Sequence, residues 1–263
     1  MLRPVIQINR ALSGDYDKDK IILMEIAESP TTAANAYLHA EVVMRLCEII
    51  THDTPSAPNY PERSGPIRKV FDELFPIAYF AKLHFLGSNE VTICWHNGNQ
   101  NFDATVEDQR KDSSRSSIRY LEVTTLQDRQ DAELLTRLAE DKTVYTEGES
   151  VLADHLRKVE SLRTALKKKG KKKYPPNTAL LVYTDEDRFQ SFSFGPQSPQ
   201  IDRKSSFGDV LKEMPNLLAV FSEVFVYSKH EIYCSLSASQ EPSGPAHEPT
   251  STRGRDTDPS ASS

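Results

Sequence analysis

The chain has 263 residues and a formal net charge of −6, with 38% hydrophobic and 27% charged residues, a balance typical of a soluble globular protein with polar extensions. No apolar run approaches the ~20 residues needed to cross a bilayer. The N-terminal sequence lacks the basic-then-apolar layout of a secretory signal, and the three cysteines are too scattered for a disulfide framework or a zinc knuckle. These features argue against a membrane-spanning or disulfide-rich protein, and we expect a cytoplasmic location.

Residues 1–50 are predicted to form an accessory segment with one amphipathic helix. Thr31 and Thr32 follow a proline and suit the N-terminal cap of that helix. The apolar residues that follow are spaced to form one stripe on a helix: Ala40, Val43, Met44 and Cys47. We expect this segment to support the rest of the chain or to mediate a homodimer. Residues 51–66 contain four prolines and are predicted to be a linker.

Residues 67–236 are predicted to form one α/β domain with the element order α-β-β-β-α-β. A helix is expected over 67–86, with Pro76 kinking it or marking a second start. The β-rich sequence VTICW predicts a first strand, and the following HNGNQN contains Asn-Gly, the strongest short hairpin signal. FDATVED and IRYLEVTT predict the second and third strands.

The remaining elements follow the third strand. Helical patterns cover 131–141 and about 150–169, and the second of these repeats leucine or valine every three or four residues, so one face packs on the sheet. The continuous apolar sequence TALLVYTDED predicts a buried central strand. A helix over 207–221 and a strand from 223 complete the domain, with a possible edge strand at 232–236. The Ser/Pro/Thr-rich residues 237–263 are predicted to be a disordered tail.

Two carboxylates are expected on neighbouring strands, because strands that follow one another in sequence usually pair. Asp103 begins the second strand, and Glu122 shares one face of the third strand with Thr124. A strand glutamate between Leu121 and Val123 is costly without a partner. Two close carboxylates favour Mg²⁺ or Mn²⁺, which can activate water and offset charge on a phosphodiester. The alternative is that Asp103 caps the turn and Glu122 faces solvent.

A strongly basic stretch lies within this acidic protein, with nine Lys or Arg residues and one acid, Glu160, between 157 and 173. Such a local excess of positive charge is typical of a polyanion-binding surface, and the alternative is a solvated helix end. The nucleic-acid-binding residues predicted from this stretch are Arg157, Arg163, Lys167, Lys168, Lys169, Lys171, Lys172 and Lys173.

The element order and the two acids resemble the restriction-endonuclease-like PD-(D/E)XK nuclease superfamily over roughly residues 67–236. The resemblance implies metal ligation by Asp103 and Glu122, assisted by Glu73 from the first helix. It also implies a lysine two residues after Glu122, where this chain has Thr124.

Because Thr124 cannot carry the positive charge of the lysine that the resemblance implies, another residue would have to supply that charge. Thr124 would orient the water or a bound ion, and either Lys158 or Lys169 of the basic helix would supply the charge. We expect Asp103, Glu122, Thr124 and Lys158 to be catalytic in a Mg²⁺- or Mn²⁺-dependent hydrolysis of phosphodiester bonds in DNA or RNA. Two alternatives remain: a catalytically inactive nucleic-acid-binding module of the same fold, and a protein-interaction scaffold.

Overall fold

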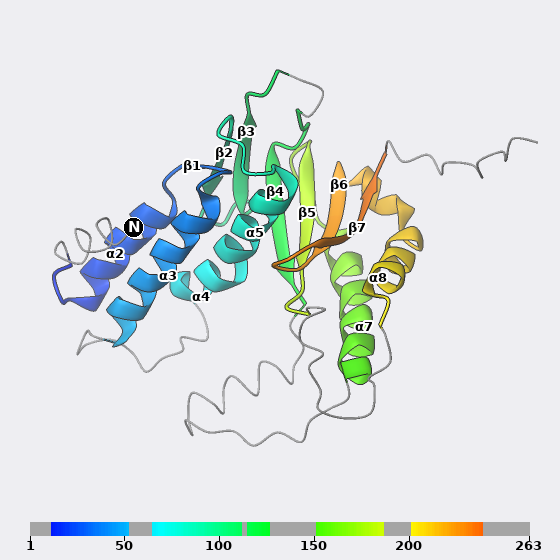
Figure 1. The fold of residues 1–263 in the computed structure, drawn as a ribbon, viewed down its shortest axis with the longest axis horizontal. Coiled ribbons are helices and arrows are strands. Elements are labelled where there is room, and N and C mark those ends of the chain that lie inside the picture. The colour runs from blue at the N-terminus through cyan, green and yellow to red at the C-terminus, as the bar shows by residue number, and fades with distance from the viewer. Residues whose placement is uncertain (1–11, 53–64, 112–114, 127–150, 187–200, 239–263) are drawn as a thin grey trace, which may run out of the picture.

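The computed structural model describes residues 12–52, 65–111, 115–126, 151–186 and 201–238. A mixed sheet of seven strands lies between two layers of helices (Figure 1), so the predicted α/β class is confirmed. In the described ranges, no helix combines the length and apolarity needed to cross a membrane. The predicted helix at 131–141 and nearly all of the predicted tail lie outside the described residues, as does most of the predicted linker.

The strands follow the chain in order across the sheet. The first four pair antiparallel, β4, β5 and β6 are parallel to one another, and the last is again antiparallel. β5 is buried at all but its last residue, which explains its continuous apolar sequence. The strands are β1 (Thr31–Thr32), β2 (Val91–Trp95), β3 (Ala104–Asp108), β4 (Tyr120–Thr125), β5 (Thr178–Tyr183), β6 (Glu223–Tyr227) and β7 (Ile232–Ser237).

The N-terminal half of the chain covers one face of the sheet (Figure 1). The predicted amphipathic helix is observed, and Ala40, Val43 and Cys47 of its stripe are buried in the same core as Leu121 and Val123 of β4, whereas Met44 is only half-buried. Thr31 and Thr32 do not cap it, because their backbones pair with β2 as a short edge strand. The helices on this face are α2 (Tyr16–Ala27), α3 (Ala36–His52), α4 (Pro66–Lys69), the π-helix η1 (Val70–Leu74) and α5 (Phe75–His84).

The other face is covered by α7 (Val151–Lys169), α8 (Arg203–Lys212) and the 3₁₀-helix η3 (Pro215–Ala219). The predicted helix at 207–221 is therefore two elements. It begins earlier, because Asp202 accepts a hydrogen bond from the Ser205 N–H and caps α8. It stops before Pro215, whose ring cannot continue an α-helix and which instead opens η3.

The second helix start predicted at Pro76 is observed, because α5 begins at Phe75 with Pro76 in its first turn, directly after the π-helix η1. The N–H of Phe75 bonds to the carbonyl of Val70, five residues back, instead of the usual four. Such π turns are rare in helices and frequent at functional sites. This turn carries Glu73, whose side chain reaches Trp95 of β2.

Candidate functional site

The candidate site lies where β3 and β4 separate. β2 and β3 pair from Val91↔Asp108 to Trp95↔Ala104, whereas β3 and β4 pair only at Ala104↔Leu121 and Thr105↔Tyr120. Asp103 stands at this fork: its N–H donates to the Leu121 carbonyl at 2.7 Å, and its Oδ2 accepts from the Val123 N–H at 2.6 Å. The Asp103 carboxylate thus accepts the hydrogen bond of the Val123 N–H where backbone pairing between β3 and β4 has ended, and it lies beside Glu122.

Glu122 projects from β4 onto the face covered by α7, and its side chain is only 8% exposed. Oε1 of Glu122 accepts a hydrogen bond from Nζ of Lys169 at 2.6 Å and from the hydroxyl of Tyr174 at 3.2 Å. The Lys169 ammonium also donates to the Val123 carbonyl at 3.0 Å. The end of α7 therefore brings a positive charge directly to the strand glutamate.

Glu73 reaches the same region from the π-helix, where its Oε2 accepts from the indole N–H of Trp95 at 3.1 Å. Burial and the negative charge of Asp103 raise the pKa of Glu73 to about 7. Burial and the negative charge of Glu122 in turn raise the pKa of Asp103 to about 6, although the Val123 N–H and Lys169 oppose this rise. We call these three residues, Glu73, Asp103 and Glu122, the carboxylate cluster. Their negative charges repel one another, and the neighbouring hydrogen bonds and lysines only partly offset this repulsion.

The carboxylate cluster should make the metal-free protein less stable as the pH rises. The raised pKa values mean that the folded state holds these protons more tightly than the unfolded chain, so the stabilisation is complete at acidic pH and is lost as the pH passes about 6 and then about 7. In EDTA, we expect the free energy of unfolding by urea to fall between about pH 4 and about pH 7. A Glu73→Gln/Asp103→Asn variant should show a flatter dependence, and equal slopes in the two proteins would contradict this assignment.

Two members of the carboxylate cluster, Asp103 and Glu122, offer the oxygen ligands that a small divalent cation prefers. In the described part of the chain, no three His, Cys, Asp or Glu side chains are arranged to hold a metal ion by themselves. Mg²⁺, however, is usually held by one or two carboxylates together with waters and substrate phosphates. The pair Asp103 and Glu122 offers this chemistry, and the raised pKa of Asp103 marks a negative charge that a cation would stabilise.

Lys158 does not join the carboxylate cluster, although it was expected to be the catalytic cation. Its Nζ is buried in ion pairs with Asp154 and Asp185 at the opposite end of α7. Burial lowers the pKa of Lys158, but the two carboxylates raise it further, so the net shift is upward. About three helical turns, or roughly 16 Å of rise, separate it from Lys169, the residue that actually contacts Glu122.

Thr124 lies where the strand alternation predicted, on the same face of β4 as Glu122. It is half-buried and pairs in register with Val182 of β5. It carries no charge, and the ammonium that contacts Glu122 comes from Lys169 of α7.

The basic stretch divides into paired and exposed residues. Arg157 forms an ion pair with Asp154 within α7. Arg163 forms ion pairs with Glu160 of α7 and with Glu213 at the end of α8. Both arginines therefore have carboxylate partners within the protein. Lys169 is directed to Glu122. The exposed members gather at the C-terminal end of α7 and in the loop after it: Lys167, Lys168, Lys171, Lys172 and Lys173. We call these five residues the lysine surface, which adjoins the carboxylate cluster through Lys169.

Sequence reasoning missed two groups at this site. Tyr174 donates to Glu122, but no sequence pattern distinguishes it from an ordinary loop tyrosine. Lys69 of α4 bonds to the Gly98 carbonyl in the β2–β3 turn, and its positive charge lowers the pKa values of Glu73 and Asp103. Both depend on contacts between distant segments, so local periodicity carries no signal for them.

A second buried polar network joins α7, α8 and the end of β5. Nδ1 of His155 lies 2.8 and 2.9 Å from the two oxygens of Glu186, which also accepts from Nε of Arg203 at 2.8 Å. Nε2 of His155 lies 2.8 Å from the Ser206 hydroxyl. That hydroxyl also bonds to the Asp202 carbonyl at 2.6 Å within the first turn of α8, and both His155 and Glu186 are buried. We therefore interpret this Ser–His–Glu geometry as a structural tie between the helices.

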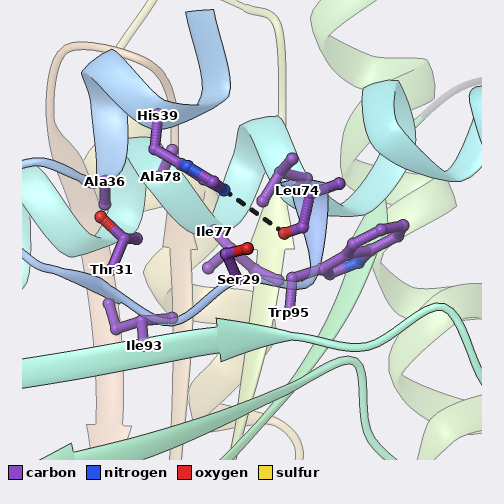
Figure 2. A pocket seen from close by; sticks show the side chains of 10 residues that line it. Ser29, Thr31, Ala36, His39, Leu74, Ile77, Ala78, Ile93 and Trp95 are labelled. Carbon is purple, nitrogen blue, oxygen red and sulfur yellow. Dashed lines mark hydrogen bonds between the residues drawn. The ribbon is translucent and has the colours of Figure 1, made fainter. Parts of the chain in front are cut away.

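A small cavity lies behind Trp95, on the N-terminal face of the sheet. Figure 2 shows it between His39 and Trp95, with Leu74 and Ile77 beside them. His39 is held there by a contact of 3.3 Å between its Nε2 and the Ala27 carbonyl. The cavity volume of about 10 Å³ is enough for about one water molecule, so this space cannot serve as a substrate pocket.

Comparison with known proteins returned no relative. No family model matches the chain, and neither a curated protein nor a solved structure matches it.

Proposed function

We propose that this chain is a metal-dependent phosphodiesterase of nucleic acid, with an active site built from the carboxylate cluster and Lys169. The observation that supports this most is the contact between the Lys169 ammonium and Glu122, beside Asp103 at the fork of β3 and β4. The resemblance to PD-(D/E)XK nucleases calls for a lysine near these acids, and Thr124 stands in its sequence position. Lys169 supplies the same charge from the adjacent helix.

Each residue has a role that follows from its position. Asp103 and Glu122 would hold Mg²⁺ or Mn²⁺, with Glu73 assisting from the π-helix. The bound cation would supply Lewis acidity and an activated water. Lys169 would release Glu122 and turn its ammonium to the phosphate, where it would stabilise negative charge that develops in the transition state. Thr124, on the same face as Glu122, would orient the water.

The lysine surface would bind the phosphate backbone of the substrate. Its lysines are exposed and adjoin the carboxylates, so a strand bound to them would pass the active site. Because lysine–phosphate contacts release counterions, binding should weaken steeply as salt increases. DNA and RNA share this backbone charge, so both are candidate substrates.

The test is cleavage of single- and double-stranded DNA and RNA with Mg²⁺, with Mn²⁺ and with EDTA. Glu122→Gln removes a cation ligand while keeping the side-chain shape, so we expect cleavage to fall by about 10³-fold or more. Binding measured in EDTA should persist, and the fold should be checked by thermal unfolding.

Two other outcomes identify the alternatives. Binding of nucleic acid without cleavage under either metal would indicate a catalytically inactive binding module. A parent protein that neither binds nor cleaves would overturn the proposal and favour the protein-interaction scaffold.

A further inference from the structure

The segment from Lys169 to Tyr174 is anchored at both ends to one atom. In the described part of the chain, the Glu122 carboxylate accepts hydrogen bonds from the Lys169 ammonium and the Tyr174 hydroxyl, and Oε1 is the acceptor in both. Between them the backbone turns back on α7, with the N–H of Gly170 on the Leu166 carbonyl at 2.9 Å and that of Lys172 on the Lys169 carbonyl at 3.0 Å. This short loop presents the exposed residues 171–173.

Tyr174 is held rigidly enough to act as a fixed donor. Its ring packs on Phe221 with 4.7 Å between the ring centroids, and it is half-buried. The Tyr174 hydroxyl donates to Oε1 of Glu122 at 3.2 Å, separately from the Lys169 ammonium. The hydroxyl can therefore keep donating to the carboxylate when the lysine ammonium does not.

We propose that Tyr174 is a positioning residue for phosphodiester hydrolysis: its hydroxyl fixes Oε1 of Glu122 and leaves Oε2 to bind the cation. This inference rests on the proposed function. It explains why both Lys169 and Tyr174 donate to the same oxygen of Glu122. When Lys169 releases Glu122 to reach the phosphate, the Tyr174 hydroxyl would keep the carboxylate in its orientation. It also ties the lysine-bearing loop at 170–173 to the metal ligand, so the bound backbone and the cation would be positioned by the same side chain, that of Glu122.

Tyr174→Phe tests this inference because it removes the hydroxyl and keeps the ring on Phe221. We would measure the Mn²⁺ dissociation constant by electron paramagnetic resonance without nucleic acid, and the Mn²⁺ dependence and KM of cleavage with it. Loss of a hydrogen bond to a ligating carboxylate should raise the Mn²⁺ dissociation constant and the midpoint for cleavage by about 10- to 100-fold. KM for nucleic acid at saturating Mn²⁺ should stay within about twofold of the parent.

Two comparison variants separate positioning from general damage. Tyr120→Phe makes the same change two residues before Glu122 on the same strand face, where the ring packs on Phe102, and it should behave like the parent. Lys171→Gln/Lys172→Gln/Lys173→Gln should raise KM about tenfold at moderate salt and leave the Mn²⁺ dissociation constant unchanged.

The outcomes distinguish this inference from the proposed function. If the parent cleaves and Tyr174→Phe titrates with Mn²⁺ like the parent, or raises KM alone, the positioning role is overturned and the nuclease proposal stands. If the parent binds Mn²⁺ without cleaving, and Tyr174→Phe weakens that binding, the hold on Glu122 is supported and the proposed reaction fails. If the parent neither binds Mn²⁺ nor cleaves, both are overturned.

Discussion

Replacing Lys169 by methionine is expected to lower kcat by about 10³-fold while leaving most of the nucleic-acid affinity in place. The proposed role of this ammonium is to stabilise charge that develops in the transition state, and groups of this kind typically contribute 10²–10³-fold. The lysine surface still carries five exposed lysines in the variant, so KM should rise only slightly. Single-turnover cleavage at saturating Mn²⁺ measures the effect directly.

The control for Lys169→Met is Lys212→Met, which makes the same change at a lysine of α8 whose side chain is 78% exposed. This control should cleave like the parent. A Lys169→Met protein with full activity would show that the ion pair with Glu122 is structural and that another cation serves the reaction. Removal of the ammonium also leaves Glu122 without its main partner, so thermal unfolding of both variants should accompany the kinetics.

The second large effect is expected on stability, at Glu186. Its side chain is 2% exposed and faces both His155 and Arg203, so Glu186→Gln leaves a buried guanidinium without its counter-charge. Removing one partner of a buried ion pair typically costs 3–5 kcal/mol, and because glutamine keeps part of the hydrogen bonding we expect about 3 kcal/mol. The midpoint of thermal unfolding should fall by about 6–12 °C for a chain of this size.

Glu213→Gln is the matched control for Glu186→Gln, because Glu213 also pairs with an arginine but does so at the surface. Exposed pairs contribute little, so the unfolding midpoint should barely change. Both variants should cleave nucleic acid normally at low temperature, since the network around His155 lies at the far end of α7 from Lys169. A Glu186→Gln protein as stable as the parent would contradict the structural interpretation of this network.

Local sequence patterns determined most of the elements of the fold. The Asn97–Gly98 turn between two β-rich segments predicted the hairpin, and β2 and β3 pair as expected. The apolar repeat of α7 predicted its buried face correctly at Val159, Leu162 and Leu166, but it was wrong at the N-terminal end of the helix, where Leu152 and Leu156 are 40% and 59% exposed. Strand alternation and the tendency of consecutive strands to pair were also enough to predict that Asp103 and Glu122 would lie together.

Contacts between distant segments decided the rest, because they depend on how the elements pack and not on local propensity. Lys158 and Lys169 look alike in the sequence, yet the packing of α7 on the sheet directs one to Asp185 and the other to Glu122. The same packing buries His155, a polar residue that the apolar repeat does not include. Tyr174 reaches Glu122 only because the loop after α7 folds back beside β4. The sequence thus predicted two carboxylates on neighbouring strands, and only the tertiary structure determined which cation and which hydroxyl hold them.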